Sequence, residues 1–127
     1  MKIKTSQFGE VEFTDENIII FEDGILGFEE LKKYLLISEK DEVFYWLTSI
    51  EQPEIIFPLF PVNLLREDYQ QEEDFEPYGI VKLDKDPGKI TVNLKSPIYI
   101  NQKNRKGFQK ILDVEKYPIN YQLFVTN

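Results

Sequence analysis

The segment TVNLKSPIYIN, residues 91–101, carries the clearest strand pattern in the sequence and decides the fold class. Its apolar side chains recur at a period of two, at Val92, Leu94, Ile98 and Ile100. A β-strand with one buried face requires this period, because successive side chains point to opposite faces of the sheet. The segment therefore predicts a long strand with a continuous buried row.

The opposite row of this strand contains poor strand formers and a proline, which cannot donate a hydrogen bond to a neighbouring strand. We expect this outward row to face solvent; its members are Thr91, Asn93, Lys95, Pro97, Tyr99 and Asn101. A straight strand over residues 89–101 would span about 40 Å at roughly 3.3 Å per residue, which is long for a small domain. The strand must therefore bend, and Pro97 is the expected place.

Short β-rich segments, most of them bounded by Pro, Gly, Asn or Asp, recur along the rest of the chain. The expected strands lie at residues 17–21, 43–49, 54–60, 78–83, 89–95, 97–101 and 120–126, after a pair of short strands that meet at residues 8–10. DKDPGK, residues 84–89, predicts a hairpin turn. LKKYLLI, residues 31–37, predicts a helical turn followed by a strand, and residues 108–113 fit either a helix or a strand.

These segments predict one all-β, mostly antiparallel domain over residues 1–127, shaped as a small barrel or sandwich with one or two short helical turns. Phe44, Trp46 and residues 57–61 are assigned to its core, with an exposed groove as the alternative. Pro58 and Pro61 predict an open sheet edge nearby, because proline is excluded from the middle of a sheet.

Composition excludes much chemistry. The sequence has no cysteine and no histidine, which removes disulfides, zinc fingers, thiol nucleophiles and the commonest general base. Asp84 and Asp86 lack the remaining ligands of a calcium loop. We therefore expect no enzyme, no metal and no cofactor. The N-terminus lacks the apolar region of a signal peptide and no run approaches a membrane span, so the expected compartment is cytoplasmic, without membrane contact.

Charge is concentrated in an acidic segment, residues 67–76, within a chain of formal net charge -8. Its acids are Glu67, Asp68, Glu72, Glu73, Asp74 and Glu76, with no base among them. The segment is either a solvated loop or a docking surface for a basic partner. The net charge disfavours direct nucleic-acid binding, because it repels phosphate backbones.

The complementary basic segment, residues 101–110, carries Lys103, Arg105, Lys106 and Lys110 without an acid. A solvated turn closed by glycine explains it simply. An RNA-binding loop is the alternative, since cations beside aromatic side chains contact phosphates and stack on bases.

Three stretches together resemble the FliW family of bacterial flagellar assembly factors. They are DGILGFEELKKYLLI (residues 23–37), FYWLTSIEQPEIIFPLFPVNLLREDY (44–69) and TVNLKSPIYINQKNRKGFQKIL (91–112). The third is the most specific, through Asn93, Leu94, Lys95, Pro97, Ile98, Asn101, Arg105, Gly107 and Gln109. The sequence departs from the family pattern at Thr48, Pro58 and Ser96.

The resemblance implies a β-barrel-like protein without catalytic activity that binds flagellin in the cytoplasm as a chaperone-like partner. It also implies antagonism of CsrA, the RNA-binding repressor of flagellin translation, so that flagellin synthesis follows export. The expected partner-binding residues are Glu67, Asp68, Glu72, Glu73, Asp74, Asn93, Lys95, Pro97, Tyr99, Asn101, Arg105 and Gln109. Oligomeric state stays open. The alternative functions are a small barrel that binds nucleic acid or oligosaccharide and, with less support, a carboxylate-based hydrolase.

Overall fold

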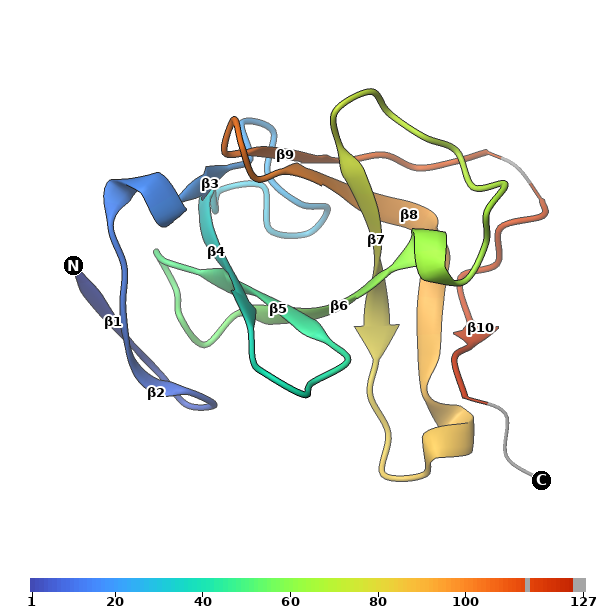
Figure 1. The fold of residues 1–127 in the computed structure, drawn as a ribbon, viewed down its shortest axis with the longest axis horizontal. Coiled ribbons are helices and arrows are strands. Elements are labelled where there is room, and N and C mark those ends of the chain that lie inside the picture. The colour runs from blue at the N-terminus through green and yellow to red at the C-terminus, as the bar shows by residue number, and fades with distance from the viewer. Residues whose placement is uncertain (114, 125–127) are drawn as a thin grey trace.

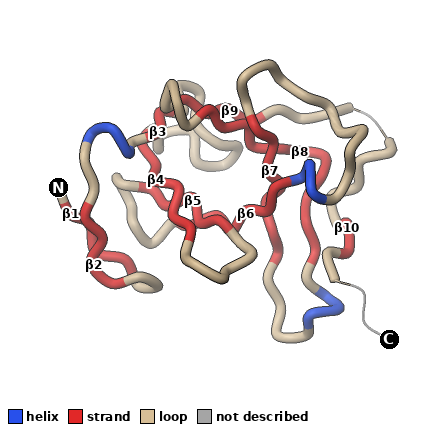
Figure 2. The backbone as a smooth tube through the Cα atoms, in the orientation of Figure 1, coloured by secondary structure: helices blue, strands red, loops and turns tan. Residues whose placement is uncertain are grey.

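The computed structural model describes residues 1–113 and 115–124 and consists almost entirely of β-strands (Figures 1 and 2). The strands are β1 (Lys2–Thr5), β2 (Gly9–Glu12), β3 (Ile19–Ile20), β4 (Lys33–Ser38), β5 (Tyr45–Ser49), β6 (Ile56–Pro61), β7 (Glu76–Lys82), β8 (Thr91–Asn101), β9 (Lys106–Gln109) and β10 (Tyr121–Gln122). Three single 3-10 turns accompany them: η1 (Asp15–Asn17), η2 (Val62–Leu64) and η3 (Pro87–Lys89). The all-β prediction is confirmed.

Seven strands close into a barrel in the order β8-β7-β6-β5-β4-β3-β9, and β9 returns to β8 to complete the ring (Figure 1). Neighbouring strands in the ring are antiparallel except β3 and β9, which pair in parallel at Ile20 and Lys106. β10 pairs with the beginning of β8, outside the ring. β1 and β2 form a separate two-stranded hairpin beside the barrel.

β8 does not run straight but turns a corner partway along its length (Figure 1). Its register against β7 shifts between the pairs Tyr78–Ile98 and Ile80–Asn93, so extra β8 residues lie opposite the single residue Gly79. The Asn93 side-chain oxygen accepts hydrogen bonds from the next amides, Lys95 N at 2.9 Å and Ser96 N at 3.0 Å. This bulge, residues 94–97, confirms the predicted bend and increases the local twist, as bulges do.

The bulge divides the apolar row of β8 between two separate hydrophobic cores. Ile98 and Ile100 belong to the interior core of the barrel, whereas Val92 and Leu94 belong to an outer core. All four side chains are buried, as the period predicts. The alternation therefore identified the buried row correctly but not the fact that its halves face different cores.

The two cores use opposite faces of the same strands. On β5, Leu47 enters the interior core, while its neighbour Trp46 enters the outer core. The outer core is completed by segments that lie outside the ring, through side chains such as Val62, Tyr69 and Leu112. Each such large apolar side chain stabilises the fold by roughly 1.5–3 kcal/mol on burial. The assignment of Phe44 and Trp46 to the core is confirmed.

The helical turn predicted at the start of residues 31–37 is wrong, whereas the strand predicted after it is found as β4. β4 (Lys33–Ser38) begins directly after a loop, and Leu31 is a buried loop residue. The apparent helical spacing arises because Tyr34 and Leu35, adjacent on opposite faces of β4, are both buried. A strand covered on both faces gives a continuous apolar run, which a periodicity argument does not distinguish from a helix.

Other predicted boundaries need smaller corrections. The strand at residues 17–21 shortens to β3, because its first residue lies in η1. Residues 108–113, left open above, contribute their first two residues to strand β9. The strand predicted at residues 120–126 is found only at β10, and its residues 125–126 lie outside the described residues. The hairpin turn at residues 84–89 joins β7 to β8, as expected.

The open edge predicted at Pro58 and Pro61 is also wrong, because β6 lies between β5 and β7 in the ring. The hydrogen bond from Ser49 N to Ile55 O fixes which β6 residues face β5, and by alternation Pro58 N faces β7 and Pro61 N faces β5. The β7 ladder begins only at Leu59, and the β5 ladder ends there. Pro58 therefore lies outside the β6–β7 ladder and Pro61 outside the β5–β6 ladder, so neither ladder needs the N–H that proline lacks.

Gly79→Ala tests whether close approach of β7 and β8 is required at the bulge. An added Cβ would lie 2.4 Å from Val92 Cγ2 and 2.9 Å from Asn93 O. Overpacking of this kind costs about 1–3 kcal/mol, so we expect the urea midpoint of unfolding to fall accordingly.

The control is a double-mutant cycle with Val92→Ala, which removes the nearer of the two clashing groups. The cost of Gly79→Ala should shrink in this background. Strict additivity of the two free-energy changes would show that the clash is not the cause.

Candidate functional site

The acidic segment crosses the outside of the barrel between η2 and β7, next to β8 (Figure 1). It is held there by three tyrosine hydroxyls. Tyr69 donates to Leu94 O in β8, Tyr99 donates to Gln70 O at 2.9 Å, and Tyr117 donates to Asp68 O at 3.4 Å. These anchors fix the backbone of the segment, so its charges project from a defined position.

Asp68 is the centre of a small charged cluster. Arg66 Nε lies 3.4 Å and Lys116 Nζ 3.8 Å from its carboxylate oxygens. The hydrogen bond from the Arg66 side chain is the largest cause that lowers the pKa of the Asp68 carboxyl. Both cations also lie over the ring of Tyr117, at 5.5 and 5.2 Å from its centroid. The Asp68 carboxylate is therefore already paired with cations of the same chain.

Glu72 is likewise occupied, because it forms an ion pair with Lys110 just after β9. The remaining four acids of the segment differ, because they are exposed and form no ion pair within the described part of the chain: Glu67, Glu73, Asp74 and Glu76. Of these, Glu76 accepts a hydrogen bond from the Tyr78 hydroxyl at 3.1 Å. Asp74 has a positive φ of 69° in the turn that leads into β7. Two of the six acids of the predicted acidic surface are thus paired within the chain, Asp68 and Glu72.

The outward row of β8 is not a solvent-facing stripe, which corrects the expectation for Pro97, Tyr99 and Asn101. Tyr99 has 0% of its surface exposed and Asn101 6%, and Pro97 is also buried. The reason is that β9 and the acidic segment cover the second half of β8. An alternating pattern cannot reveal this second cover, since it comes from elsewhere in the chain.

Tyr99 is part of an aromatic stack on the outside of the barrel. Its ring lies parallel to that of Phe108 at a centroid distance of 5.1 Å, and Phe108 meets Phe75 edge-on at 4.9 Å. Burial, with a smaller contribution from Tyr117, raises the pKa of the Tyr99 phenol to about 12. The stack joins β8, β9 and the end of the acidic segment into one surface.

The remaining predicted residues mainly organise backbone. Asn93 shapes the bulge, as described above, and the Asn101 side chain accepts a hydrogen bond from Asn104 N at 3.0 Å. Arg105, at φ 58°, donates to Asp15 O at 2.6 Å. Gln109 donates to Ser96 O at 3.2 Å and accepts from Leu26 N at 2.8 Å. Lys95 is half-buried.

The structure therefore brings together only part of the predicted set. The acidic segment, Tyr99 and Gln109 lie around the second half of β8, while Asn93 and Lys95 belong to the bulge and Arg105 to the turn before β9. Sequence reasoning missed the anchors Tyr69 and Tyr117. An aromatic residue among acids was the available signal for Tyr69. Within the described residues, no group of three acidic side chains is placed to hold a metal ion.

The fold and this surface define a small closed, mostly antiparallel β-barrel protein that presents an anchored acidic segment on its outer face. The sequence profile of the FliW protein family matches residues 2–123. The chain belongs to the FliW family of flagellar assembly factors, and the resemblance found in the sequence is confirmed. None of the helical turns in the described residues has the length or apolar character to cross a bilayer.

Similar proteins agree with this assignment. The chain is 38% identical to the flagellar assembly factor FliW of Caldicellulosiruptor saccharolyticus, over 96% of this chain and 90% of the relative. It is 40% identical to that of Clostridium kluyveri, over 98% and 96%. A crystal structure of the flagellar assembly factor FliW superposes with a TM-score of 0.89 at 29% identity, covering 100% of this chain and 99% of that one. These relatives carry the name of an assembly factor, not of an enzyme.

Tyr99→Phe tests the anchor between β8 and the acidic segment. Loss of the bond to Gln70 O should cost about 0.5–1.5 kcal/mol at neutral pH. At high pH the unfolded phenol loses its proton near pH 10, whereas the folded one keeps it to about pH 12. Stability of the wild type should therefore fall between these values, and the variant should fall less steeply.

Urea unfolding of both proteins at pH 7, 9 and 11.5 makes this measurement. Tyr45→Phe is the matched control at pH 7, since the Tyr45 hydroxyl has no hydrogen bond within the described residues. Identical pH slopes for wild type and Tyr99→Phe would contradict the role given to this hydroxyl.

Proposed function

We propose that this chain binds flagellin in the cytoplasm as a chaperone-like partner and, in competition with flagellin, binds and antagonises the translational repressor CsrA. Membership of a family of flagellar assembly factors supports a role in flagellum biogenesis. In this scheme, unexported flagellin occupies the chain and leaves the repressor free. Export of flagellin releases the chain, which then sequesters the repressor and allows flagellin translation.

The observation that carries the proposal is the anchored acidic segment on a chain of net charge -8. A repressor that binds RNA must present a cationic surface, because phosphate contacts supply most of its affinity. Opposite charge attracts such a partner and speeds its association. Once bound, the acids of this chain lower the positive potential that RNA requires.

The strongest candidates for contact with the basic partner are Glu67, Glu73 and Asp74, which are exposed, lie before β7 and form no ion pair within the described residues. Asp68 and Glu72 contribute less, since their charges are already paired within the chain. Among the other expected contact residues, Lys95 is partly exposed and Tyr99 is covered. Tyr99 would therefore act by holding the acidic segment in place.

Exclusion between the two partners needs only a coupling free energy. If flagellin lowers the affinity for the repressor by some factor, the repressor must lower the affinity for flagellin by the same factor. Overlapping sites and a change of shape both satisfy this linkage.

A nucleic-acid-binding or oligosaccharide-binding barrel is the alternative from another class. Its support was the basic segment together with the aromatic side chains Tyr99 and Phe108. These rings stack on each other, and the Tyr99 ring is buried, so its face is not free for a base or a sugar. The net charge further favours the protein-binding function.

Calorimetric titration with purified CsrA, with and without saturating flagellin, tests the proposal. We expect binding that flagellin abolishes and that weakens between 50 and 200 mM salt, because salt screens exposed charges. Replacing Glu67, Glu73 and Asp74 together by serine should weaken CsrA binding roughly ten-fold at low salt, at up to about 1 kcal/mol for each surface charge.

A matched triple variant separates this local effect from a change in net charge. Glu39, Glu42 and Glu54 are exposed acids in other loops, and their replacement by serine changes the net charge equally. Equal loss of affinity in both triple variants would exclude a specific acidic surface. No binding of either partner by the wild type would overturn the proposed function.

A further inference from the structure

The edge of β4 that faces β3 is only partly covered. β3 pairs with β4 at two positions, Ile19 with Tyr34 and Ile20 with Lys33. β4 continues to Ser38 and remains paired with β5 on its other edge throughout. Among the described residues, its last four therefore have a neighbouring strand on one side only.

The backbone groups of this uncovered stretch can be assigned from alternation. Ile50 N donates to Lys33 O, so Lys33 faces β5, and so do Leu35 and Ile37 in the same row. Leu36 and Ser38 then direct their N–H and C=O groups to the opposite edge. Within the described residues, neither makes a hydrogen bond on that side.

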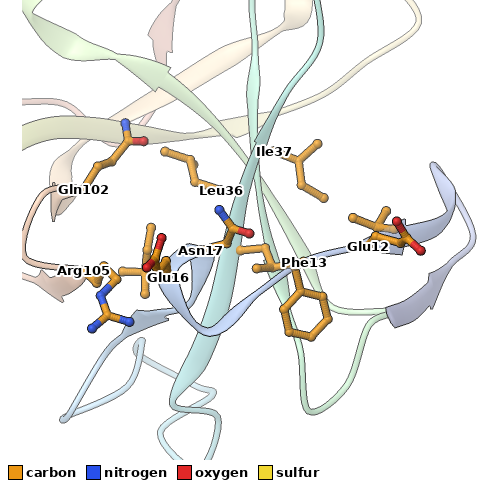
Figure 3. Close-up of a pocket in the computed structure, with 11 residues that line it drawn as sticks. Glu12, Phe13, Glu16, Asn17, Leu36, Ile37, Gln102 and Arg105 are labelled. Atoms are coloured by element: carbon orange, nitrogen blue, oxygen red, sulfur yellow. The ribbon is translucent and has the colours of Figure 1, made fainter. Parts of the chain in front are cut away.

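The chain that could have covered this edge turns away from it. The 3-10 turn η1 interrupts the extended backbone before β3. Its capping hydrogen bond joins Thr14 N to the Asn17 side chain, so Asn17 bonds to Thr14 and not to β4. A cavity of about 270 Å³ remains beside the edge (Figure 3). Leu35, Leu36 and Ile37 line it from β4, and residues 11–13 line it from the hairpin.

The hairpin presents a second backbone edge to this cavity. Phe13 exchanges backbone hydrogen bonds with Met1, at 2.9 and 3.0 Å, so Val11 and Phe13 face β1. By alternation, the backbone of Glu12 faces away from β1. The Glu12 residue also lines the cavity, where Glu16 lies as well.

We propose that this cavity is an acceptor site for an extended segment of a partner protein, which adds to the free edge of β4 as a strand. Strand addition takes its affinity from main-chain hydrogen bonds and its specificity from alternate side chains. The unpaired backbone N–H and C=O groups of Leu36 and Ser38 are available for these main-chain hydrogen bonds. Four residues of free edge accommodate a segment of about 13 Å at roughly 3.3 Å per residue.

The lining of the cavity specifies an occupant in which apolar and basic residues alternate. Ile37 and Val11 are partly exposed apolar side chains that line the cavity. Glu12 and Glu16 are exposed acids that line the cavity, and they outnumber Arg105, its one lining cation among the described residues. Glu12 also forms an exposed ion pair with Lys2 at 3.7 Å. A basic side chain is therefore attracted and an acidic one repelled.

The same charges disfavour a second copy of this chain as the occupant. Its own free hairpin edge would bring Glu10 and Glu12 against Glu12 and Glu16, and both copies carry a net charge of -8. Like charges that face each other in a sheet are destabilising. The inference is also independent of the proposed function, because it does not specify flagellin or CsrA.

Hydrogen–deuterium exchange measured by NMR on the intact chain tests the site. The probe is the hexapeptide acetyl-Lys-Val-Lys-Ile-Lys-Val-amide. We expect it to slow exchange of the Leu36 and Ser38 amides at least ten-fold. The Leu35 and Ile37 amides, already bonded to β5, should be slow with and without peptide and serve as internal controls.

Two altered peptides separate strand addition from attraction by charge alone. A version N-methylated at alternate residues on the β4-facing edge should lose the protection although its charge is unchanged. A version with glutamate in place of lysine should not bind. Equal protection by either peptide would overturn the proposal.

Charge reversal on the protein provides the matched variants. Glu12→Lys combined with Glu16→Lys should weaken the lysine peptide at least ten-fold, whereas Glu54→Lys combined with Glu73→Lys, outside the cavity, should weaken it less. Protection of Leu36 and Ser38 in the free protein that rises with protein concentration would identify a second copy as the occupant and contradict the proposal.

Discussion

The close contact between Gly79 and the bulge of β8 is the constraint on which the rest of the structure depends. Without a side chain at Gly79, the backbones of β7 and β8 approach closely enough for β8 to carry extra residues at this point. The corner that results turns the second half of β8 toward β9, which closes the barrel. It leaves Val92 and Leu94 in the outer core, where β10 and the residues before it pack.

The position of the acidic segment also depends on the corner in β8. Leu94 O, which accepts a hydrogen bond from the Tyr69 hydroxyl, belongs to the bulge, and Tyr99, which donates to Gln70 O, lies two residues after it. A segment with many like charges would otherwise remain a mobile loop, because its acids repel one another. Buried tyrosines offset this repulsion by combining apolar burial with one hydrogen bond each. The exposed charges are thereby presented without a large loss of entropy on binding.

Predictions from local sequence were correct where burial alternates along a strand, and they failed where it does not. The period of two located the buried row of β8, and Pro97 located its bend. The outward row was misjudged at Tyr99, because the acidic segment arrives from a distant part of the chain and Phe108 of the next strand, β9, stacks on the ring. The helical turn predicted at the start of residues 31–37 failed for a related reason: β4 is covered on both faces, and its alternation is lost.

The sequence by itself determined the all-β class, the buried rows, the absence of cysteine and histidine chemistry, the acidic charge and the family. These properties follow from composition, local periodicity and residue spacing, which need no knowledge of neighbours in space. Only the tertiary structure decided which core each half of β8 faces, which acids are paired and which part of β4 is left without a neighbouring strand. Such features depend on which distant segments meet, and pairing between strands is set by the whole sheet rather than by any one strand.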